Sequence, residues 1–383
     1  MSTIVFNRPH VTGRELGYIQ QVIDNAHLSG NGEFAERCQR WLERQTGAAR
    51  SLLTHSCTGA LEMSALLLGV QPGDEVIMPS FTFVSTANAF VLRGAVPVFV
   101  DIRPDTLNLD ERLIEASIGP RTKVIAPVHY AGVGCEMDTI MAIARSHGLA
   151  VVEDAAQCIL ASYRGRALGA IGDLGTLSFH ESKNVHCGEG GALLVNDPEL
   201  KDRADIIQEK GTNRQQFFRG QVDKYSWIDI GSSYLPSEIA AAFLLAQLED
   251  AAEITARRLA IWDAYHAAFA GLEARELLRR PIIPADRTHN AHMYYVLMPD
   301  LESRTRTLRE LNGAGVHSVF HYVPLHSARA GVRFGRTVGD LPVTDDLSDR
   351  LIRLPLWPDL APSEIDRVIE TMERVTRGVV ARR

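Results

Sequence analysis

Residues 149–157 read LAVVEDAAQ, an apolar run that ends directly in two acids. A helical stretch, residues 135–148 (CEMDTIMAIARSHG), precedes it. Similar apolar runs recur in the first half of the chain: residues 74–80 (DEVIMPS), 97–102 (PVFVDI), 123–132 (KVIAPVHYAG), 176–180 (TLSFH) and 190–197 (GGALLVND). Runs of this kind, spaced by helices and without polar alternation, are typical of parallel strands covered on both faces. We therefore predict an α/β fold with a mostly parallel sheet, whose ligands bind at the carboxyl ends of the strands.

The alternation of strands and helices fades after about residue 235, where longer helical stretches and short strand-like pieces follow. A chain of 383 residues is also too long for one simple core. We predict a large α/β domain with an N-terminal helix over residues 1–245 and a small α+β domain over residues 246–383.

The composition argues against several classes of protein. A net charge of -7 disfavours a general nucleic-acid binder. No apolar run reaches the length of a membrane span, and the first residues lack the pattern of a signal peptide. Five widely spaced cysteines without a C-x-x-C pair favour a reducing compartment. We expect a cytoplasmic protein with no membrane span and no nucleic-acid partner.

Three features carry candidate chemistry. Ser56, Thr58 and Gly59 open the apolar helix that starts in SCTGALEMSALLLG, so their free N–H groups could bind a phosphate or simply cap the helix. Asp154 follows its strand directly and could cap the next helix or face a cationic ring nitrogen. Lys183, in the glycine-flanked stretch SFHESKNVHCGEGG, could be a surface cation or form a Schiff base.

Taken together, the three features match the parts that hold pyridoxal 5'-phosphate (PLP): a phosphate cup, a partner for the ring nitrogen and a lysine for the aldehyde. A metal site is not expected, because the spacing of His180, His186 and Cys187 fits no common zinc pattern. The one G-x-G-x-x-[GA] match, at residues 30–35, has no strand before it, which argues against a nicotinamide-binding enzyme. A non-catalytic regulator of the same fold would need a basic DNA-binding segment, which neither end of the sequence suggests.

Several longer motifs resemble the DegT/DnrJ/EryC1/StrS family of sugar-nucleotide aminotransferases: SCTGALEM (56–63), GDEVIMPSFTFVSTANA (73–89), PVFVDIRPDTLNLD (97–110), PVHYAG (127–132), VVEDAAQ (151–157), SFHESKN (178–184), EGG (189–191) and YVPLH (322–326). The resemblance covers essentially the full length. It implies a PLP-dependent transferase of fold type I (aspartate aminotransferase-like) with a seven-stranded, mostly parallel sheet. It also implies a homodimer or higher homo-oligomer with active sites at the subunit interface. Within the family, residues 79–95 and 209–235 most resemble the transaminases that act on dTDP-4-dehydro-6-deoxy-D-glucose in enterobacterial common antigen synthesis.

The resemblance also implies a role for individual residues. Lys183 would form the internal aldimine and act as general base and acid, and Asp154 would pair with the pyridine nitrogen. The remaining cofactor contacts would be Gln157 at the ring hydroxyl, Phe83 on the ring face, and Thr58, Gly59 and Ser178 at the phosphate. The family asparagine that reaches the neighbouring subunit's phosphate is Ser233 here, and its arginine is Leu235, which puts that contact in doubt.

The expected reaction moves the amino group of L-glutamate to the 4-keto group of a dTDP-4-dehydro-6-deoxyhexose, with pyridoxamine 5'-phosphate (PMP) as the intermediate cofactor form. The product would be a dTDP-4-amino-4,6-dideoxyhexose, the galactose epimer, for antigen or lipopolysaccharide biosynthesis. A sugar-nucleotide dehydratase and a 3-keto sugar aminotransferase of the same family are the alternatives. Retention of Lys183, which the dehydratases replace with histidine, favours transamination.

The substrate contacts are expected at strand ends and in one long irregular loop. The loop interleaves cations with aromatic side chains, which fits a nucleotide-binding loop or a subunit contact. His129 and His180 would line the site or satisfy hydrogen bonds at strand ends, and for His326 a structural role is equally plausible. The candidates are His129, His180, Lys210, Arg214, Arg219, Tyr225, Tyr322 and His326.

Overall fold

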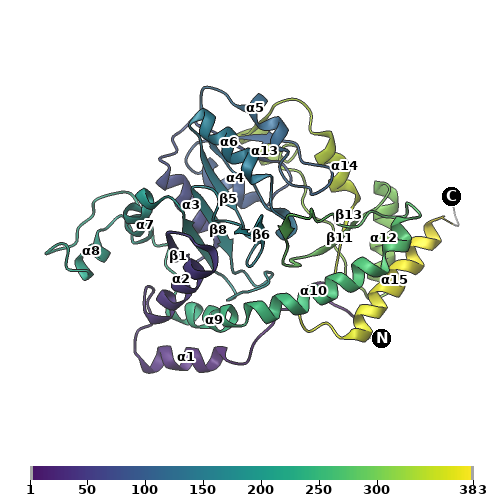
Figure 1. The fold of residues 1–383 in the computed structure, drawn as a ribbon, viewed down its shortest axis with the longest axis horizontal. Helices are drawn as coiled ribbons and strands as arrows, with labels where there is room; N and C mark the ends of the chain where they lie inside the picture. The colour runs from purple at the N-terminus through teal and green to yellow at the C-terminus, as the bar shows by residue number, and fades with distance from the viewer. Residues whose placement is uncertain (1–2, 381–383) are drawn as a thin grey trace.

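The computed structural model describes residues 3–380, with side chains to residue 377 (Figure 1). Its main sheet has the strand order β1-β9-β8-β5-β4-β2-β3-β12. The strands are β1 (Arg50–Thr54), β9 (Gly191–Val195), β8 (Leu174–Ser178), β5 (Ala150–Asp154), β4 (Thr122–Ile125), β2 (Glu75–Pro79), β3 (Val96–Val100) and β12 (Arg336–Thr337). β9 runs antiparallel to β1 and β8, and the other neighbours are parallel. This is the mostly parallel sheet that the apolar runs predicted.

The sheet contains the seven expected strands and an eighth, β12, at its edge. β12 has two residues and comes from the C-terminal half of the chain, so no apolar run in the sequence marks it. Gly335 lets this segment approach β3 closely, because a Cβ there would lie 2.5 Å from the Phe99 ring. Arg336 then donates to both carboxylate oxygens of Glu75, at 3.0 and 2.8 Å.

Helices cover both faces of the sheet, as the unbroken apolar strands require. One face packs against α2 (Glu33–Thr46), α6 (Met137–His147) and α9 (Glu238–Glu249), and the other against α3 (Cys57–Leu67), α4 (Val84–Val91) and α7 (Lys201–Gln208). Successive strand residues alternate between the two cores: Leu53 and Ile77 face the first, and Leu52 and Val76 face the second. α1 (Glu15–Asp24) lies outside this layer, against α9.

The C-terminal half builds a separate core around the antiparallel pair β11 (Tyr294–Leu297) and β13 (Leu351–Leu354). Three long helices surround it: α10 (Ala251–Ala268), α12 (Leu301–Gly313) and α15 (Pro362–Val380) (Figure 1). Ile4, from the opposite end of the chain, is buried in the same core and pairs with Val316. The expected boundary at residue 245 falls inside α9, and the division into two domains stays a prediction.

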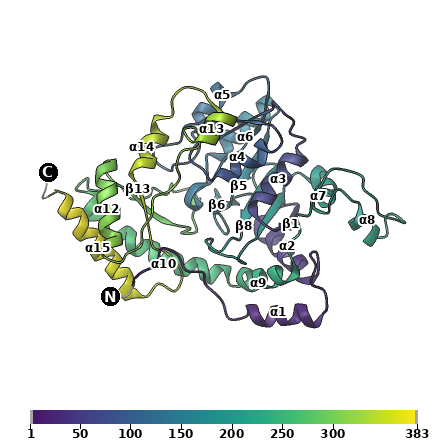
Figure 2. The same ribbon diagram turned by 180° about the vertical axis from the view of Figure 1, so that it is seen from behind.

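The remaining elements are short. They are α5 (Ile114–Ser117), α8 (Arg214–Phe218), α11 (Ala270–Glu273), α13 (Arg329–Phe334), α14 (Pro342–Arg350), the strands β6 (Ser162–Tyr163), β7 (Arg166–Ala167) and β10 (Arg287–Thr288), and the 3-10 turns η1 (Glu111–Leu113), η2 (Tyr130–Gly132) and η3 (Pro198–Leu200). The segment that carries α8, residues 209–235, projects away from the sheet as an arm (Figures 1 and 2). Within residues 3–380, no helix combines the length and apolar character needed to cross a membrane.

Candidate active site

A cavity of about 660 Å³ lies between the carboxyl edge of the sheet and the C-terminal half of the chain. Eight of the predicted site residues line it: Thr58, Phe83, Asp154, Gln157, Ser178, His180, Lys183 and Tyr322. They come from strand ends and loops that lie more than a hundred residues apart in the sequence. The parallel sheet brings them together because its strands end at one edge.

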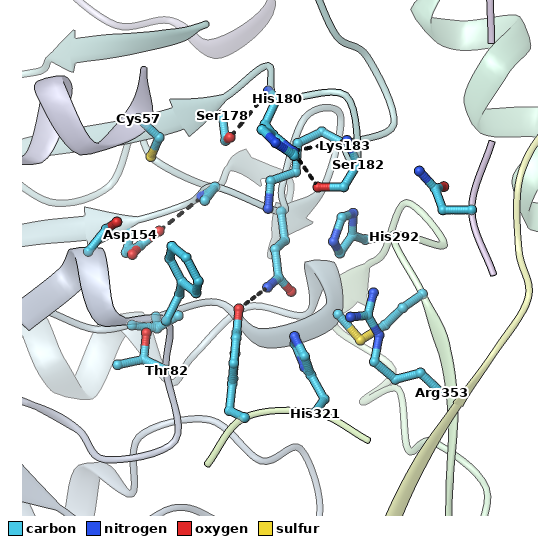
Figure 3. A pocket seen from close by; sticks show the side chains of 18 of the residues that line it. Cys57, Thr82, Asp154, Ser178, His180, Ser182, Lys183, His292, His321 and Arg353 are labelled. Atoms are coloured by element: carbon cyan, nitrogen blue, oxygen red, sulfur yellow. Dashed lines mark hydrogen bonds between the residues drawn. The ribbon is translucent and has the colours of Figure 1, made fainter. Parts of the chain in front are cut away.

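Lys183 stands near the middle of the cavity, on the loop that follows β8 (Figure 3). Its backbone N–H donates to the carbonyl of His180 at 2.9 Å, which fixes the loop as a turn. Burial lowers the pKa of Lys183 below its ordinary value, and the nearby charge of Arg353 lowers it further, whereas Asp154 opposes the shift. A lowered pKa favours the neutral amine, which is the nucleophile and the base.

Asp154 ends β5 as a buried carboxylate, 6% exposed. Its Oδ2 accepts from the hydroxyl of Thr86 at 2.7 Å, and its Oδ1 accepts from the N–H of Ala156 at 3.1 Å. These bonds fix the orientation of the carboxylate. A fixed, buried carboxylate holds a proton on a ring nitrogen placed beside it, because a low dielectric strengthens that charge pair. It does not cap a following helix, since the chain enters turns there.

The N-terminus of α3 lies at one end of the cavity. Ser56 caps this helix, with its Oγ accepting from the N–H of Gly59 at 3.1 Å, while Thr58 faces the cavity and donates to Ser85 at 2.8 Å. Ser56 therefore caps the helix, while the Thr58 hydroxyl lies at the cavity. Gly191 permits this packing, because a Cβ there would lie 2.4 Å from the backbone N of Cys57. Gly59 itself does not line the cavity.

Gln157 and Tyr322 connect the sheet edge to the C-terminal half. The Gln157 side chain donates to the Tyr322 hydroxyl at 3.2 Å and accepts from the N–H of Ala131 at 2.7 Å. His321 stacks on Tyr322, with ring centroids 3.6 Å apart, and meets the hydroxyl of Tyr130 at 2.9 Å. Burial lowers the pKa of His321 well below its usual value, as do the charges of Arg353 and Lys183, so the ring is neutral.

The C-terminal half lines the cavity with the predicted Tyr322 and with residues that the sequence alone did not single out. We call Arg258, His292, His321, Tyr322 and Arg353 the C-terminal wall, and Thr58, Asp154 and Ser178 the sheet wall. Figure 3 shows Asp154 and Ser178 on one side of Lys183 and His292, His321 and Arg353 on the other. The sequence held one signal for Arg353. Ile352 and Leu354 on either side of it are apolar and buried in the C-terminal core, so the alternation of a strand places Arg353 on the opposite face.

His129 is not in the cavity. Its side chain is fully buried, with Nε2 2.8 Å from the carboxylate of Glu153 and Nδ1 accepting from the N–H of Cys135. Because Nδ1 accepts a hydrogen bond it carries no proton, so the ring proton is on Nε2 and is donated to Glu153. Glu153 also accepts from the N–H groups of Gly169 and Gly172. The structure therefore gives His129 the hydrogen-bonding position at a strand end, not a substrate contact.

His326 also lies outside the cavity lining. Its Nδ1 lies 2.7 Å from the Ser80 hydroxyl, and its backbone N–H donates to the same oxygen at 3.0 Å. The pair connects the C-terminal half to the end of β2, which is the structural alternative for this histidine. His180 does line the cavity, where its Nδ1 lies 2.8 Å from the hydroxyl of Ser182.

The candidate substrate residues of the arm do not reach this chain's cavity. Arg219 donates to the Asp205 carboxylate at 2.8 Å, and the Arg214 guanidinium lies 5.2 Å from the centre of the Phe218 ring. The arm places the other candidates, Lys210, Tyr225 and Ser233, outside the cavity lining as well. It also exposes large aromatic side chains, such as Trp227 at 81%.

The G-x-G-x-x-[GA] match at residues 30–35 leads into α2. The N–H groups at this helix start, which have no partner within the helix, donate to a side chain instead. The Glu238 carboxylate accepts from the N–H groups of Gly32, Phe34 and Ala35 at 2.8–3.1 Å. A phosphate would have to displace this carboxylate. The interpretation as a plain loop holds for residues 30–32, whereas residues 33–35 begin α2.

The residues present fit PLP. Lys183 can bond covalently to its aldehyde, Asp154 can pair with its ring nitrogen, and the N-terminus of α3 can hold its phosphate. This site and the covered parallel sheet define a PLP-dependent transferase of fold type I. The chain belongs to the DegT/DnrJ/EryC1/StrS aminotransferase family, whose model matches residues 9–373.

Similar proteins agree with this assignment. The spore coat polysaccharide biosynthesis protein SpsC of Bacillus subtilis (strain 168) is 32% identical over 382 residues, which cover 97% of each chain. The aminotransferase TlmJ from Streptoalloteichus hindustanus is 31% identical, with a TM-score of 0.90 over 99% of this chain and 100% of its own. The putative sugar aminotransferase Spr1654 from Streptococcus pneumoniae is 27% identical, with a TM-score of 0.91 over 99% of both chains in its PMP form. It is also solved in a PLP form. The protein is a PLP-dependent aminotransferase of a sugar aminotransferase family.

Proposed function

We propose that the protein transfers the amino group of L-glutamate to the 4-keto group of a dTDP-4-dehydro-6-deoxyhexose and releases the dTDP-4-amino-4,6-dideoxy sugar of galactose configuration. The observation that carries the proposal is the position of Lys183 between Asp154 and the C-terminal wall of one cavity. The choice of sugar rests on the resemblance of residues 79–95 and 209–235 to transaminases acting on that substrate.

Each group of the sheet wall has one task in this reaction. PLP, when bound, supplies the electron sink for the charge that develops at the donor's α-carbon. Asp154 keeps the ring nitrogen protonated, and Thr86 holds the carboxylate in place for it. Thr58 and Ser178 bind the phosphate, Gln157 approaches the ring hydroxyl and Phe83 covers the ring face.

Lys183 moves the proton. Its Nζ takes the proton from the donor's α-carbon, and in the second half of the reaction it delivers a proton to C4 of the sugar. The lowered pKa of Lys183, which burial causes, prepares the amine for this task. Tyr322 and His180 contact the sugar, and the cavity walls exclude bulk water from the proton transfers.

The nucleotide end of the substrate is assigned to the arm. In a homodimer with active sites at the subunit interface, Lys210, Arg214, Arg219 and Tyr225 contact the diphosphate and base of a substrate in the neighbouring cavity, and Ser233 approaches the phosphate of PLP. The exposed aromatic side chains of the arm and its distance from its own cavity support this assignment. His129 and His326 have structural roles.

Incubation with PLP, L-glutamate and a panel of keto sugar nucleotides tests the proposal. We expect one 2-oxoglutarate per amino sugar, with amination at C4 of the dTDP-linked 6-deoxyhexose, identified by mass and NMR. Amination at C3 would favour the 3-keto sugar aminotransferase. A dehydrated sugar formed without consumption of glutamate would favour the dehydratase.

A further inference from the structure

The C-terminal wall contains two guanidinium groups that no carboxylate neutralises, one on the buried Arg258 and one on the half-buried Arg353. Arg258, 2% exposed, donates to the backbone carbonyls of Ala291 and His292 at 3.0 and 2.7 Å. Arg353 has its Nε shielded from solvent and without a hydrogen-bond partner. Within the described side chains, to residue 377, neither arginine forms an ion pair. A buried charge without a partner is costly, and ordinarily marks a place where a counter-ion binds.

The position of Arg353 is fixed on both sides of its strand. It pairs with Tyr295 across the β11–β13 ladder, and on the other side its backbone N–H donates to the carbonyl of Val319 at 2.7 Å. The Phe6 ring covers the guanidinium, whose central carbon lies 4.8 Å from the ring centroid. The guanidinium therefore lines the cavity from a rigid position, and one of its faces lies against an apolar ring.

The other charged groups around Arg353 do not neutralise it. His292 and His321 are neutral, because burial and the neighbouring cations lower the pKa of each well below its usual value. Among the residues that line the cavity, the carboxylates are those of Asp154 and Glu189. Asp154 lies across Lys183, bonded to Thr86, and the Glu189 side chain is 73% exposed beside His180. The space in front of Arg353 is thus electropositive.

We propose that Arg353, reinforced by the charge of Arg258, is the binding subsite for a carboxylate of the amino donor. The proposal rests on the proposed function for the use of an amino-acid donor. An α-carboxylate is one bond from the carbon whose proton Lys183 removes, so its cation must lie deep in the cavity near the lysine. Arg353 meets this condition, on the side of Lys183 opposite Asp154 and Ser178 (Figure 3). A planar guanidinium also binds a carboxylate in bidentate fashion.

The diphosphate of a nucleotide sugar is the competing anion. It is separated from the reacting C4 by the sugar ring, whereas Arg353 lies beside Lys183 and influences the pKa of that lysine. Donor and sugar enter in separate half-reactions, so experiments can separate the two anions.

The test uses PLP-loaded Arg353→Gln in two half-reactions. In the first half-reaction, L-glutamate converts bound PLP to PMP, and the change in absorbance of the cofactor measures the rate. In the second, the PMP form reacts with the keto sugar nucleotide. We expect the glutamate concentration at half-maximal rate to rise about 30- to 100-fold, because a charge-assisted pair is lost. The keto sugar should show a change of about threefold or less. Arg350→Gln, which removes a half-buried arginine paired with Asp346, is the matched control and should behave as wild type.

Binding of glutarate, which cannot transaminate, gives a readout separate from turnover. By calorimetry, Arg353→Gln should weaken glutarate by a similar factor and leave thymidine diphosphate unchanged. If glutarate binds equally to both proteins, or if thymidine diphosphate weakens as much as glutarate, the proposal is wrong.

If Arg353→Gln does not fold, Arg353→Lys tests the proposal in its place. Lysine keeps the positive charge but cannot bind a carboxylate in bidentate fashion, so the glutamate concentration at half-maximal rate should rise about tenfold. An unchanged value overturns the proposal. A wild-type protein that accepts glutamate's amino group but does not aminate the 4-keto sugar would overturn the proposed function and leave this subsite standing.

Discussion

The two walls of the cavity differ in how their charges are compensated. In the sheet wall, Asp154 is held by Thr86 and Ala156, and Ser56 caps the helix whose N-terminus faces the cavity. In the C-terminal wall, Arg258 and Arg353 have no carboxylate partner among the side chains described to residue 377. A cofactor that stays bound requires groups fixed in one geometry, whereas substrates that come and go can supply the missing counter-charge themselves. The difference indicates which wall serves the cofactor and which serves the substrates.

The largest effect should come from the residue between the walls. Lys183→Ala should lower turnover by about 10⁴-fold, the upper end of general acid–base catalysis, and abolish the visible absorbance of lysine-bound PLP. Steady-state kinetics and an absorbance spectrum measure both. Lys201→Ala, at the start of α7, is the matched control. Normal transamination by Lys183→Ala would refute the assignment of both walls.

Removing the charge of the sheet wall should have the next largest effect. Asp154→Asn keeps the shape of the side chain but cannot hold a proton on the ring nitrogen. We expect kcat to fall about 10²–10³-fold in both half-reactions, because the electrostatic stabilisation of developing charge is lost. Arg353→Gln should slow only the half-reaction with the amino donor. Single-turnover absorbance measurements on both variants therefore distinguish the role of the sheet wall from that of the C-terminal wall. A fall in kcat confined to one of the two half-reactions of Asp154→Asn would contradict the role of Asp154.

The buried pair behind the sheet wall should affect stability instead of chemistry. His129 is neutral in this pair: its Nδ1 accepts from the N–H of Cys135, and its Nε2–H donates to the buried carboxylate of Glu153 at 2.8 Å. The histidine thus supplies one of the hydrogen bonds that the Glu153 carboxylate needs in the interior.

His129→Leu should therefore lower the free energy of unfolding at pH 7 by about 3 kcal/mol, since it leaves a buried carboxylate without one of its hydrogen-bond donors. Urea unfolding measures it, with His147→Leu, an exposed histidine, as the control. Equal free energies of unfolding for His129→Leu and the wild type would contradict this structural role.

The smallest effect is expected on the arm. Arg219→Glu should raise the KM for the nucleotide sugar about three- to tenfold, as expected for one exposed charge, and leave PLP absorbance intact. Arg304→Glu, on α12, is the control. An unchanged KM would show that Arg219 does not bind the substrate, and the diphosphate would then have to bind at the walls of the cavity.

The sheet wall could be predicted from the sequence because its residues follow apolar strands or start an apolar helix. Asp154 and Ser178 end their strands, and Thr58 opens its helix, so the parallel topology alone places them at one edge. The C-terminal wall could not be predicted in the same way. Arg353 is a single cation inside a short strand, and it lines the cavity only because β13, paired with β11, packs against the loops that follow β2 and β3.

Two histidines show the same limit. His129 follows an apolar run just as Asp154 does, yet the carboxylate of Glu153 lies directly behind it and holds it in the interior. His326 was assigned from its motif, but the contact with Ser80 was visible only once the two halves of the chain were packed together. Strand ends predict which residues reach the edge of a sheet, and they do not predict which of them find a partner there.

The most direct test of the central claim follows the nitrogen itself. The protein is incubated with PLP, ¹⁵N-labelled L-glutamate and dTDP-4-dehydro-6-deoxy-D-glucose, and the sugar product is analysed by NMR. The account predicts ¹⁵N bonded to C4 in the galactose configuration, with one 2-oxoglutarate formed per label transferred. A label at C3, or a sugar product without ¹⁵N, would contradict it.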